Sequence, residues 1–198
     1  MCIGDRNGRS GKARVFEGRE ISTDALLTSA CLPTLFKAVN VYDETTGKTE
    51  AFWDGGYTGN PSLWPLYRRD LPEDVVIVNI NPLRRGTLPV TPQQITNRIN
   101  EISFNSSLLS ELRAVAFVQR LIEQGALSRE EKREVKVHMI ADDALMTRLS
   151  VATKSWPVTS VLHHLKEAGR AAAKDFLSAH KADLNERGTL DLAEMYGS

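Results

Sequence analysis

The alternation of apolar and polar positions predicts a chain in which strands and helices are mixed. Strands are expected where short apolar or alternating segments are bounded by Gly, Pro or polar turns: residues 13–16, 36–42, 50–53, 75–80 and 135–139. The polar segment Asp43 to Gly47 is typical of a turn, so 36–42 and 50–53 are expected to pair as a hairpin. The continuous β-branched run at 75–80 favours a strand that is buried on both faces of a parallel sheet.

Helical spacing and capping residues predict three helices. Ser22-Thr23-Asp24 can cap a short helix that carries Leu26, Leu27 and Ala30 and ends before Pro33. Thr91, Pro92 and Gln94 form a strong start for a long helix that Gly125 ends, with a bend expected near residues 105–107. A final helix is predicted by an apolar stripe: Val161, Leu165, Ala168, Ala172, Phe176 and Ala179. This order of elements favours a layered α/β domain.

Composition narrows the class of protein. A length of 198 residues suits one domain or part of a larger one. The 25 basic and 25 acidic residues cancel, so no overall field indicates nucleic acid or an anionic membrane as partner. No apolar run reaches the roughly 18 residues of a membrane span, and the start lacks a signal-peptide core. Two cysteines, Cys2 and Cys31, without metal-ligand spacing favour a reduced, cytoplasmic setting.

The glycine-rich segment Gly4 to Gly11 is expected to be a loop before the strand 13–16. A phosphate-binding loop is excluded, because only two residues separate Gly8 from Gly11 and Ala13 follows Lys12. A serine-hydrolase elbow is excluded as well, since Gly11 follows Ser10 directly.

The segment Phe52 to Pro61 carries the strongest candidate chemistry. Asp54 stands between Trp53 and the pair Gly55-Gly56, with Tyr57 next. Two glycines let the backbone approach other groups closely, and a carboxylate held there and shielded from water has a raised pKa, as a general base needs. Asp-Gly between aromatic residues is also typical of a tight turn, in which the Asp accepts local backbone hydrogen bonds.

Two segments resemble the second half of a patatin-like phospholipase. Ser29-Ala30-Cys31-Leu32-Pro33 is similar to the S-A-C/S-x-P segment of that family, and Asp54-Gly55-Gly56 is similar to its D-G-G/A motif. The similarity runs on through residues 97–105 and Val137-His138-Met139-Ile140, so it covers most of the chain.

The resemblance implies a fold and a division of the chain. The expected fold is the C-terminal part of a three-layer α/β/α patatin-like domain. Residues 1–82 would be the C-terminal part of the catalytic domain, with the D-G-G segment, and residues 83–198 a helical and α/β extension packing on it.

The resemblance also implies an activity. Asp54 would be the base of a Ser-Asp dyad, with Gly55, Gly56, Trp53 and Tyr57 shaping its loop, in a hydrolase that degrades lipids through an acyl-enzyme. No metal or organic cofactor is implied. The partner would be a lipid or acyl-ester substrate and not nucleic acid; transient contact with a membrane surface and self-association are compatible with this.

The chain carries the aspartate of the dyad without the rest of the machinery. Neither G-x-S-x-G nor a glycine-rich oxyanion loop occurs in the sequence, and in the family both precede the D-G-G segment. Little or no turnover is therefore expected from this polypeptide alone. The alternative hypothesis is a catalytically inactive remnant or interaction module of the same fold.

Other polar side chains do not complete an active site. A lone histidine on a strand, such as His138, is expected to be structural or exposed, and Asp142-Asp143 without a third ligand makes a weak metal site. Cys31 is expected to pack as a small apolar residue near the Asp54 loop. Four aromatic side chains could line an acyl pocket or pack in the core: Trp53, Tyr57, Trp64 and Tyr67.

Overall fold

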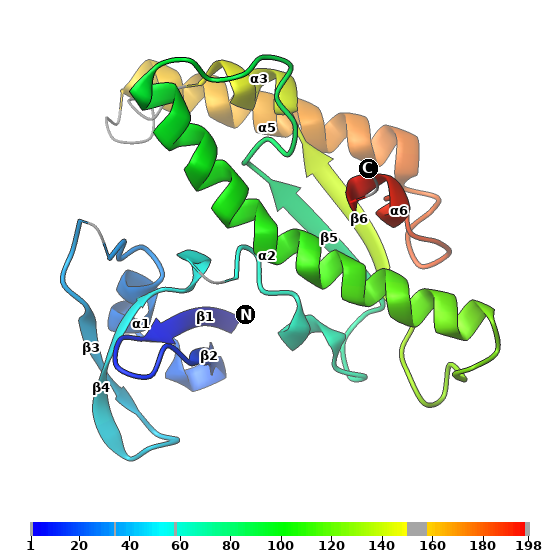
Figure 1. Cartoon of the computed structure of the whole chain (residues 1–198). Helices are drawn as coiled ribbons and strands as arrows, with labels where there is room; N and C mark the ends of the chain where they lie inside the picture. The colour runs from blue at the N-terminus through cyan, green and yellow to red at the C-terminus, as the bar shows by residue number, and fades with distance from the viewer. Residues whose placement is uncertain (1, 34, 58, 150–157, 197–198) are drawn as a thin grey trace. The chain divides into compact units, whose positions relative to one another are not determined.

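The computed structural model describes residues 2–33, 35–57, 59–149 and 158–196, without the side chains of residues 2–4, Tyr57 and Tyr196. Helices and strands are mixed, as expected, and the chain divides into two compact units, Met1–Pro65 and Leu66–Ser198 (Figure 1). This division lies earlier than the boundary expected after residue 82. The reason is that strand β5 (Asp74–Asn79) pairs with strand β6 (Lys136–Ala141) and so belongs with the later residues.

Unit 1 is built on a four-stranded sheet in the order β2-β1-β4-β3, and its strands are β1 (Cys2–Asn7), β2 (Ala13–Glu17), β3 (Val39–Asp43) and β4 (Lys48–Asp54). Every neighbouring pair is antiparallel, and the predicted hairpin is confirmed as β3 and β4. The prediction of a loop from Gly4 to Gly11 is wrong at its start. Residues up to Asn7 form β1, because they gain backbone partners on both β2 and β4 despite their polar sequence.

One helix and one face of this sheet enclose the core of unit 1. Helix α1 (Thr23–Thr28) begins where predicted, with Ser22 Oγ accepting a hydrogen bond from the N–H of Ala25 at 3.1 Å. Ala25 is fully buried with Val41 and the rings of Phe16 and Phe52, which meet edge to face at 5.3 Å. The short turns η1 (Gly18–Glu20) and η2 (Gly55–Tyr57) follow β2 and β4.

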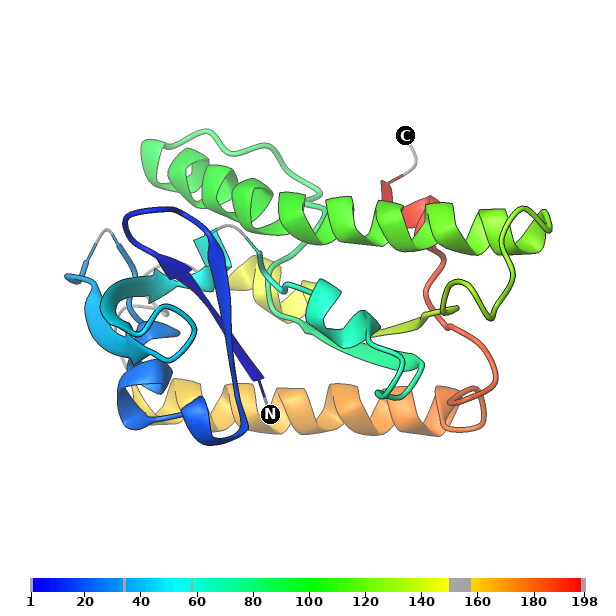
Figure 2. The ribbon, with the colours of Figure 1, turned by 90° about the horizontal axis from the view of Figure 1, so that it is seen from below.

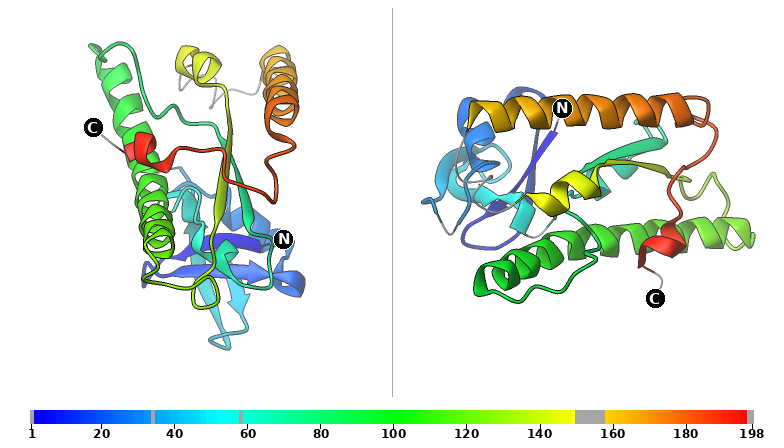
Figure 3. Two further views of the ribbon diagram at one scale, coloured as in Figure 1. Left: turned by 90° about the vertical axis from the view of Figure 1, so that its right-hand side faces the viewer. Right: turned by 90° about the horizontal axis from the view of Figure 1, so that it is seen from above.

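In unit 2 a parallel pair of strands lies between two long helices (Figures 2 and 3). Helix α2 (Pro92–Glu123) lies on one side of β5 and β6, and helix α5 (Thr159–His180) lies on the other. Shorter helices are η3 (Trp64–Tyr67), which crosses the division between the units, α3 (Asp143–Arg148), and α6 (Leu192–Tyr196), which packs on α2.

Helix α2 begins as its sequence predicts, with a capping box between Thr91 and Gln94. The helix is continuous, and its axis changes direction along its length (Figure 1). Its second half buries Leu108, Leu112 and Val115. The first half leaves isoleucines exposed, among them Ile99 at 57%.

The expectation that the strand at 75–80 is buried on both faces is wrong. Val75 and Ile77 of β5 are buried, whereas Val76 is 45% exposed and Val78 is 69% exposed. Val76 pairs in register with His138 of β6 and so shares its face of the sheet. Helix α5 covers that face at β6, through a contact between Phe176 and His138, and leaves the neighbouring valines of β5 open.

Candidate functional site

The carboxylate of Asp54 lies at the end of β4, on the core face of the unit 1 sheet. The backbone N–H of Asp54 donates to the carbonyl of Cys31 at 3.0 Å, which ties the strand end to the chain that follows α1. Its Oδ1 accepts a hydrogen bond from the N–H of Gly56 at 2.7 Å, and η2 begins directly after it. Burial raises the pKa of Asp54, while the Gly56 hydrogen bond acts in the opposite direction. The side chain is therefore both oriented and partly desolvated.

A second carboxyl group, that of Asp5, faces Asp54 across the sheet. Asp5 of β1 pairs in register with Asp54 of β4. The Asp5 side chain is 1% exposed, and its Oδ2 accepts a hydrogen bond from the hydroxyl of Thr28 on α1. Its Oδ1 is buried and has no hydrogen-bond partner among the described residues. Burial raises the pKa of Asp5 to about 6, against the Thr28 hydrogen bond and with a further contribution from the charge of Asp54.

Cys31 lies beside Asp54, and its thiol is not placed to act as a nucleophile. The side chain is 5% exposed, and its thiol donates to the carbonyl of Lys37 at 2.9 Å. Burial raises the pKa of the Cys31 thiol, and the charge of Asp54 raises it further. Because the thiolate is the reactive form, these surroundings make Cys31 inert. It packs as a small apolar residue near the Asp54 loop.

The structure separates the predicted loop residues. Gly55 and Gly56 form η2 next to Asp54, and Tyr57 ends that turn, with its side chain outside the described part of the chain, as is Thr58. Trp53 lies on the opposite face of β4, because successive strand residues alternate. Its ring would lie 3.1 Å from a Cβ at Gly8, a tight contact, and its Nε1–H donates to the carbonyl of Phe36 at 3.1 Å.

The other two aromatic candidates are Trp64, which is 53% exposed, and Tyr67, whose hydroxyl donates to Glu111 on α2 at 3.1 Å.

Sequence reasoning missed Asp5 and Thr28. The segment around Asp5 shows no apolar alternation, so nothing in the sequence marked it as a strand. Thr28 lies one residue before the S-A-C segment and reads as an ordinary helical residue. Only the pairing of β1 with β4, and the packing of α1 on that face, bring the two residues to Asp54.

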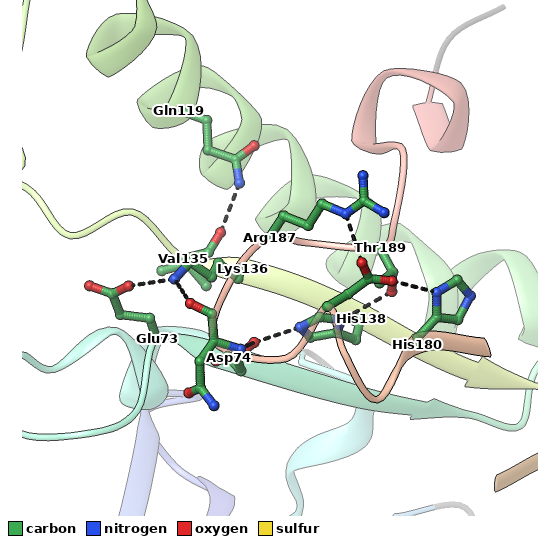
Figure 4. A network of polar contacts seen from close by, with 11 residues as sticks. Glu73, Asp74, Gln119, Val135, Lys136, His138, His180, Arg187 and Thr189 are labelled. Carbon is green, nitrogen blue, oxygen red and sulfur yellow. Dashed lines mark hydrogen bonds and ion pairs between the residues drawn. The ribbon is translucent and has the colours of Figure 1, made fainter. Parts of the chain in front are cut away.

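Unit 2 contains a separate polar network around His138 (Figure 4). His138 is fully buried, with Nε2 at 2.7 Å from Asp74 Oδ1 and Nδ1 at 3.0 Å from Thr189 Oγ1. A carboxylate can only accept, so Nε2 carries a proton. Asp74 also accepts the N–H of Asn185. Burial alone would raise the pKa of Asp74, but these hydrogen bonds lower it.

An acid, a histidine and a hydroxyl in this order are the parts of a catalytic triad, but full burial keeps substrate from this imidazole. The network holds the loop after α5 against the sheet, and of the two expectations for His138, structural or exposed, the exposed one is wrong.

A cavity of about 590 Å³ opens beside this network. Opposite charges pair along its wall, with Lys136 Nζ at 3.0 Å from Glu73 and Arg129 at 2.8 Å from Glu134. Arg69 and Arg133 donate to backbone carbonyls of neighbouring loops. These side chains hold loops together and present no nucleophile with a base.

Asp142 caps helix α3, because its Oδ1 accepts the N–H of Leu145 at 2.8 Å. Within the described ranges, no group of three or more His, Cys, Asp or Glu side chains is placed to hold a metal ion. None of the helices described here combines the length and the apolar character that crossing a membrane requires.

No protein family, curated protein or solved structure matches this chain.

Proposed function

We propose that this chain is the Asp-bearing part of a patatin-like serine acyl hydrolase that acts on lipid acyl esters. The observation that carries the proposal is the state of Asp54. Its carboxylate is fixed by the Gly56 N–H at the end of a strand, and burial raises its pKa. A general base that accepts a serine proton needs this combination of orientation and increased basicity.

The reaction proceeds in two steps with one proton relay. Asp54 takes the hydroxyl proton as a serine attacks the ester carbonyl, and that proton passes to the leaving alcohol as the acyl-enzyme forms. Water then attacks the acyl-enzyme, gives its proton to Asp54, and the proton returns to the serine when the fatty acid leaves. These 198 residues contain neither a G-x-S-x-G elbow nor a glycine-rich oxyanion loop, so the proposed reaction requires that both be supplied by residues outside them.

Two further observations support the proposal. The segment Ser29 to Pro33 lies directly beside the D-G-G turn, since the carbonyl of Cys31 accepts the N–H of Asp54. The parallel strands of unit 2 lie between α2 and α5, which is the layering expected of a three-layer α/β/α domain (Figure 2).

The test measures hydrolysis of p-nitrophenyl acyl esters of increasing chain length. We expect the 198-residue chain to show little or no turnover. The same chain preceded by the region encoded upstream of Met1, where that region carries G-x-S-x-G, is expected to be active. Asp54→Asn in the longer protein should lower kcat by 10²-fold or more, as for loss of a general base.

Glu44→Gln provides the matched control, because Glu44 is an exposed acid in the β3–β4 turn of the same unit. Full activity in Asp54→Asn would refute the assigned role of Asp54. An upstream region without a serine elbow, together with no hydrolysis, would favour the inactive remnant or interaction module.

A further inference from the structure

We propose that Asp5 is the second carboxyl group of the Asp54 site, and that the two side chains form a coupled pair that shares one proton in the folded protein. The catalytic meaning of this pair rests on the function proposed above, but the pair itself does not. Asp5 would be a positioning residue that sets how strongly Asp54 holds a proton.

The register of the sheet brings the two carboxyl groups together. Asp5 and Asp54 are directly opposed on antiparallel strands, and both side chains point to the face that α1 covers. Cβ atoms of directly opposed residues lie about 4.5–5.5 Å apart, so two short acidic side chains interact strongly. Two like charges at this separation disfavour each other, and one of the two acids retains a proton to higher pH.

Among the described residues, the groups that act on the Asp5 carboxyl include no cation. Thr28 from α1 contributes a neutral hydroxyl, and β4 contributes the acid Asp54. Arg14 is the register partner of Asp5 on β2, but its guanidinium is bound to Asp43 at 3.0 Å and to Glu20.

Independent support for a proton on the pair comes from Oδ1 of Asp5, which is buried and has no hydrogen-bond partner among the described residues. An ionised carboxylate with one oxygen buried and unsatisfied is costly. A proton on this oxygen removes the charge and turns the atom into a donor, and the Asp54 carboxylate opposite is an acceptor for it. The raised pKa of Asp5, about 6, agrees with this arrangement.

The consequence for Asp54 depends on pH. Above the Asp5 midpoint, Asp5 is ionised, and its negative charge strengthens the hold of Asp54 on a proton taken from a nucleophile. Below it, Asp5 is neutral, and Asp54 becomes the weaker base. The pair exchanges its protons with solvent one at a time, so the two carboxyl groups titrate in two steps.

The experiment is a carboxyl ¹³C NMR titration of the 198-residue chain labelled at Asp. In the wild type we expect a transition of Asp5 near pH 6 and a raised midpoint for Asp54. Asp54→Asn should move the Asp5 midpoint down by at least half a pH unit, because it removes the charge against which Asp5 titrates. Asp5→Asn should leave the Asp54 midpoint in place, since Asp54 loses its proton while Asp5 is still neutral. Thr28→Val should move the Asp5 midpoint up, since it removes the hydrogen bond that lowers it.

Asp43 serves as the internal control. Hydrogen bonds from Arg14 and from the N–H of Thr45 outweigh burial and lower the pKa of Asp43, so it should titrate below its ordinary range in every variant. Asp54→Asn carries the test, and Asp54→Ala, which removes the same charge, is the second variant. An Asp5 midpoint that stays within about 0.2 pH units of the wild type in these variants would overturn the proposal.

Activity provides a separate readout. In an active form, Asp5→Asn should abolish the change in kcat/KM that accompanies ionisation of Asp5 near pH 6, and should leave the acidic limb set by Asp54 in place. Coupled titration without hydrolysis would retain the pair and refute the hydrolase. Hydrolysis with uncoupled titration would retain the hydrolase and refute the pair.

Discussion

The sheets of unit 1 and unit 2 differ in how far helices cover the apolar side chains of their strands. In unit 1 four short strands present one face to a six-residue helix, and Phe16 and Phe52 are at most 1% exposed. In unit 2 the helices are several times longer, yet β5 leaves Val78 69% exposed on a sheet that has two strands within the described ranges. The two sheets differ in their cover: α1 closes the core face of the sheet in unit 1, whereas α5 contacts β6 and leaves the valines of β5 exposed.

The difference extends to the polar groups. Unit 1 places the acid Asp5 in its core with one carboxyl oxygen that has no hydrogen-bond partner among the described residues, and burial raises its pKa. Unit 2 satisfies its buried histidine through Asp74 and Thr189, and its buried Glu101 through Arg85 at 2.5 Å. A buried polar group without a partner is costly, and such groups are retained at functional sites more often than elsewhere. This comparison favours unit 1 as the location of chemistry.

The largest effect is expected from Phe52→Ala in the core of unit 1. Removing this ring leaves a cavity beside Phe16 and should lower the free energy of unfolding by about 3–5 kcal/mol. Hydrogen exchange of β4 amides measures the loss, and Tyr42→Ala, at a 62% exposed position of β3, is the control. Equal acceleration of exchange in β5 would mean that the two units unfold together, which would break the comparison.

Asp5→Asn should raise the free energy of unfolding at pH 7, by somewhat less than Phe52→Ala lowers it. The folded pKa of about 6 exceeds the unfolded value of 3.8, so the folded state binds the extra proton and stability falls as pH rises from about 4 to about 6. A shift of about two pKa units corresponds to roughly 3 kcal/mol. The variant lacks this decline, so it should match the wild type near pH 3.5 and exceed it at pH 7. Urea unfolding at several pH values measures this, and a variant less stable than the wild type at pH 7 would contradict it.

A moderate effect is expected at the start of helix α2. Thr91→Ala removes the Oγ that accepts the N–H of Gln94 and should lower helix stability by about 1 kcal/mol. Thr91→Ser keeps the acceptor and is the matched control. If exchange in the first turn of α2 is unchanged in Thr91→Ala, the cap is not what fixes this helix start.

The smallest effect on stability is expected from Val78→Lys. This variant also tests whether the exposed valines of β5 in unit 2 drive self-association. A charge at this exposed position should change the free energy of unfolding by less than about 0.5 kcal/mol. It should reduce self-association, because exposed apolar strand surfaces drive association. Sedimentation velocity over a range of concentrations measures this, with Glu44→Gln as a surface control. A wild-type chain that stays monomeric at high concentration would show that the open valines do not drive association.

The sequence by itself determined the local elements of this protein. The caps at Ser22 and Thr91, the hairpin around Asp43, and the parallel strand at 75–80 depend on interactions within a few residues or on strong apolar patterns. It also placed Asp54 next to two glycines that form a turn. Such signals are readable because propensity and capping act locally.

Only the tertiary structure decided which polar residues meet. Asp5 lies in a polar segment that becomes a strand through pairing with β2 and β4, and Thr28 reaches it from a helix 23 residues further along the chain. Whether both faces of β5 are buried could not be predicted from the sequence either, because a β-branched run has the same pattern whether or not a helix covers it. Strand pairing and helix cover join residues that are distant along the chain, so no local pattern records them.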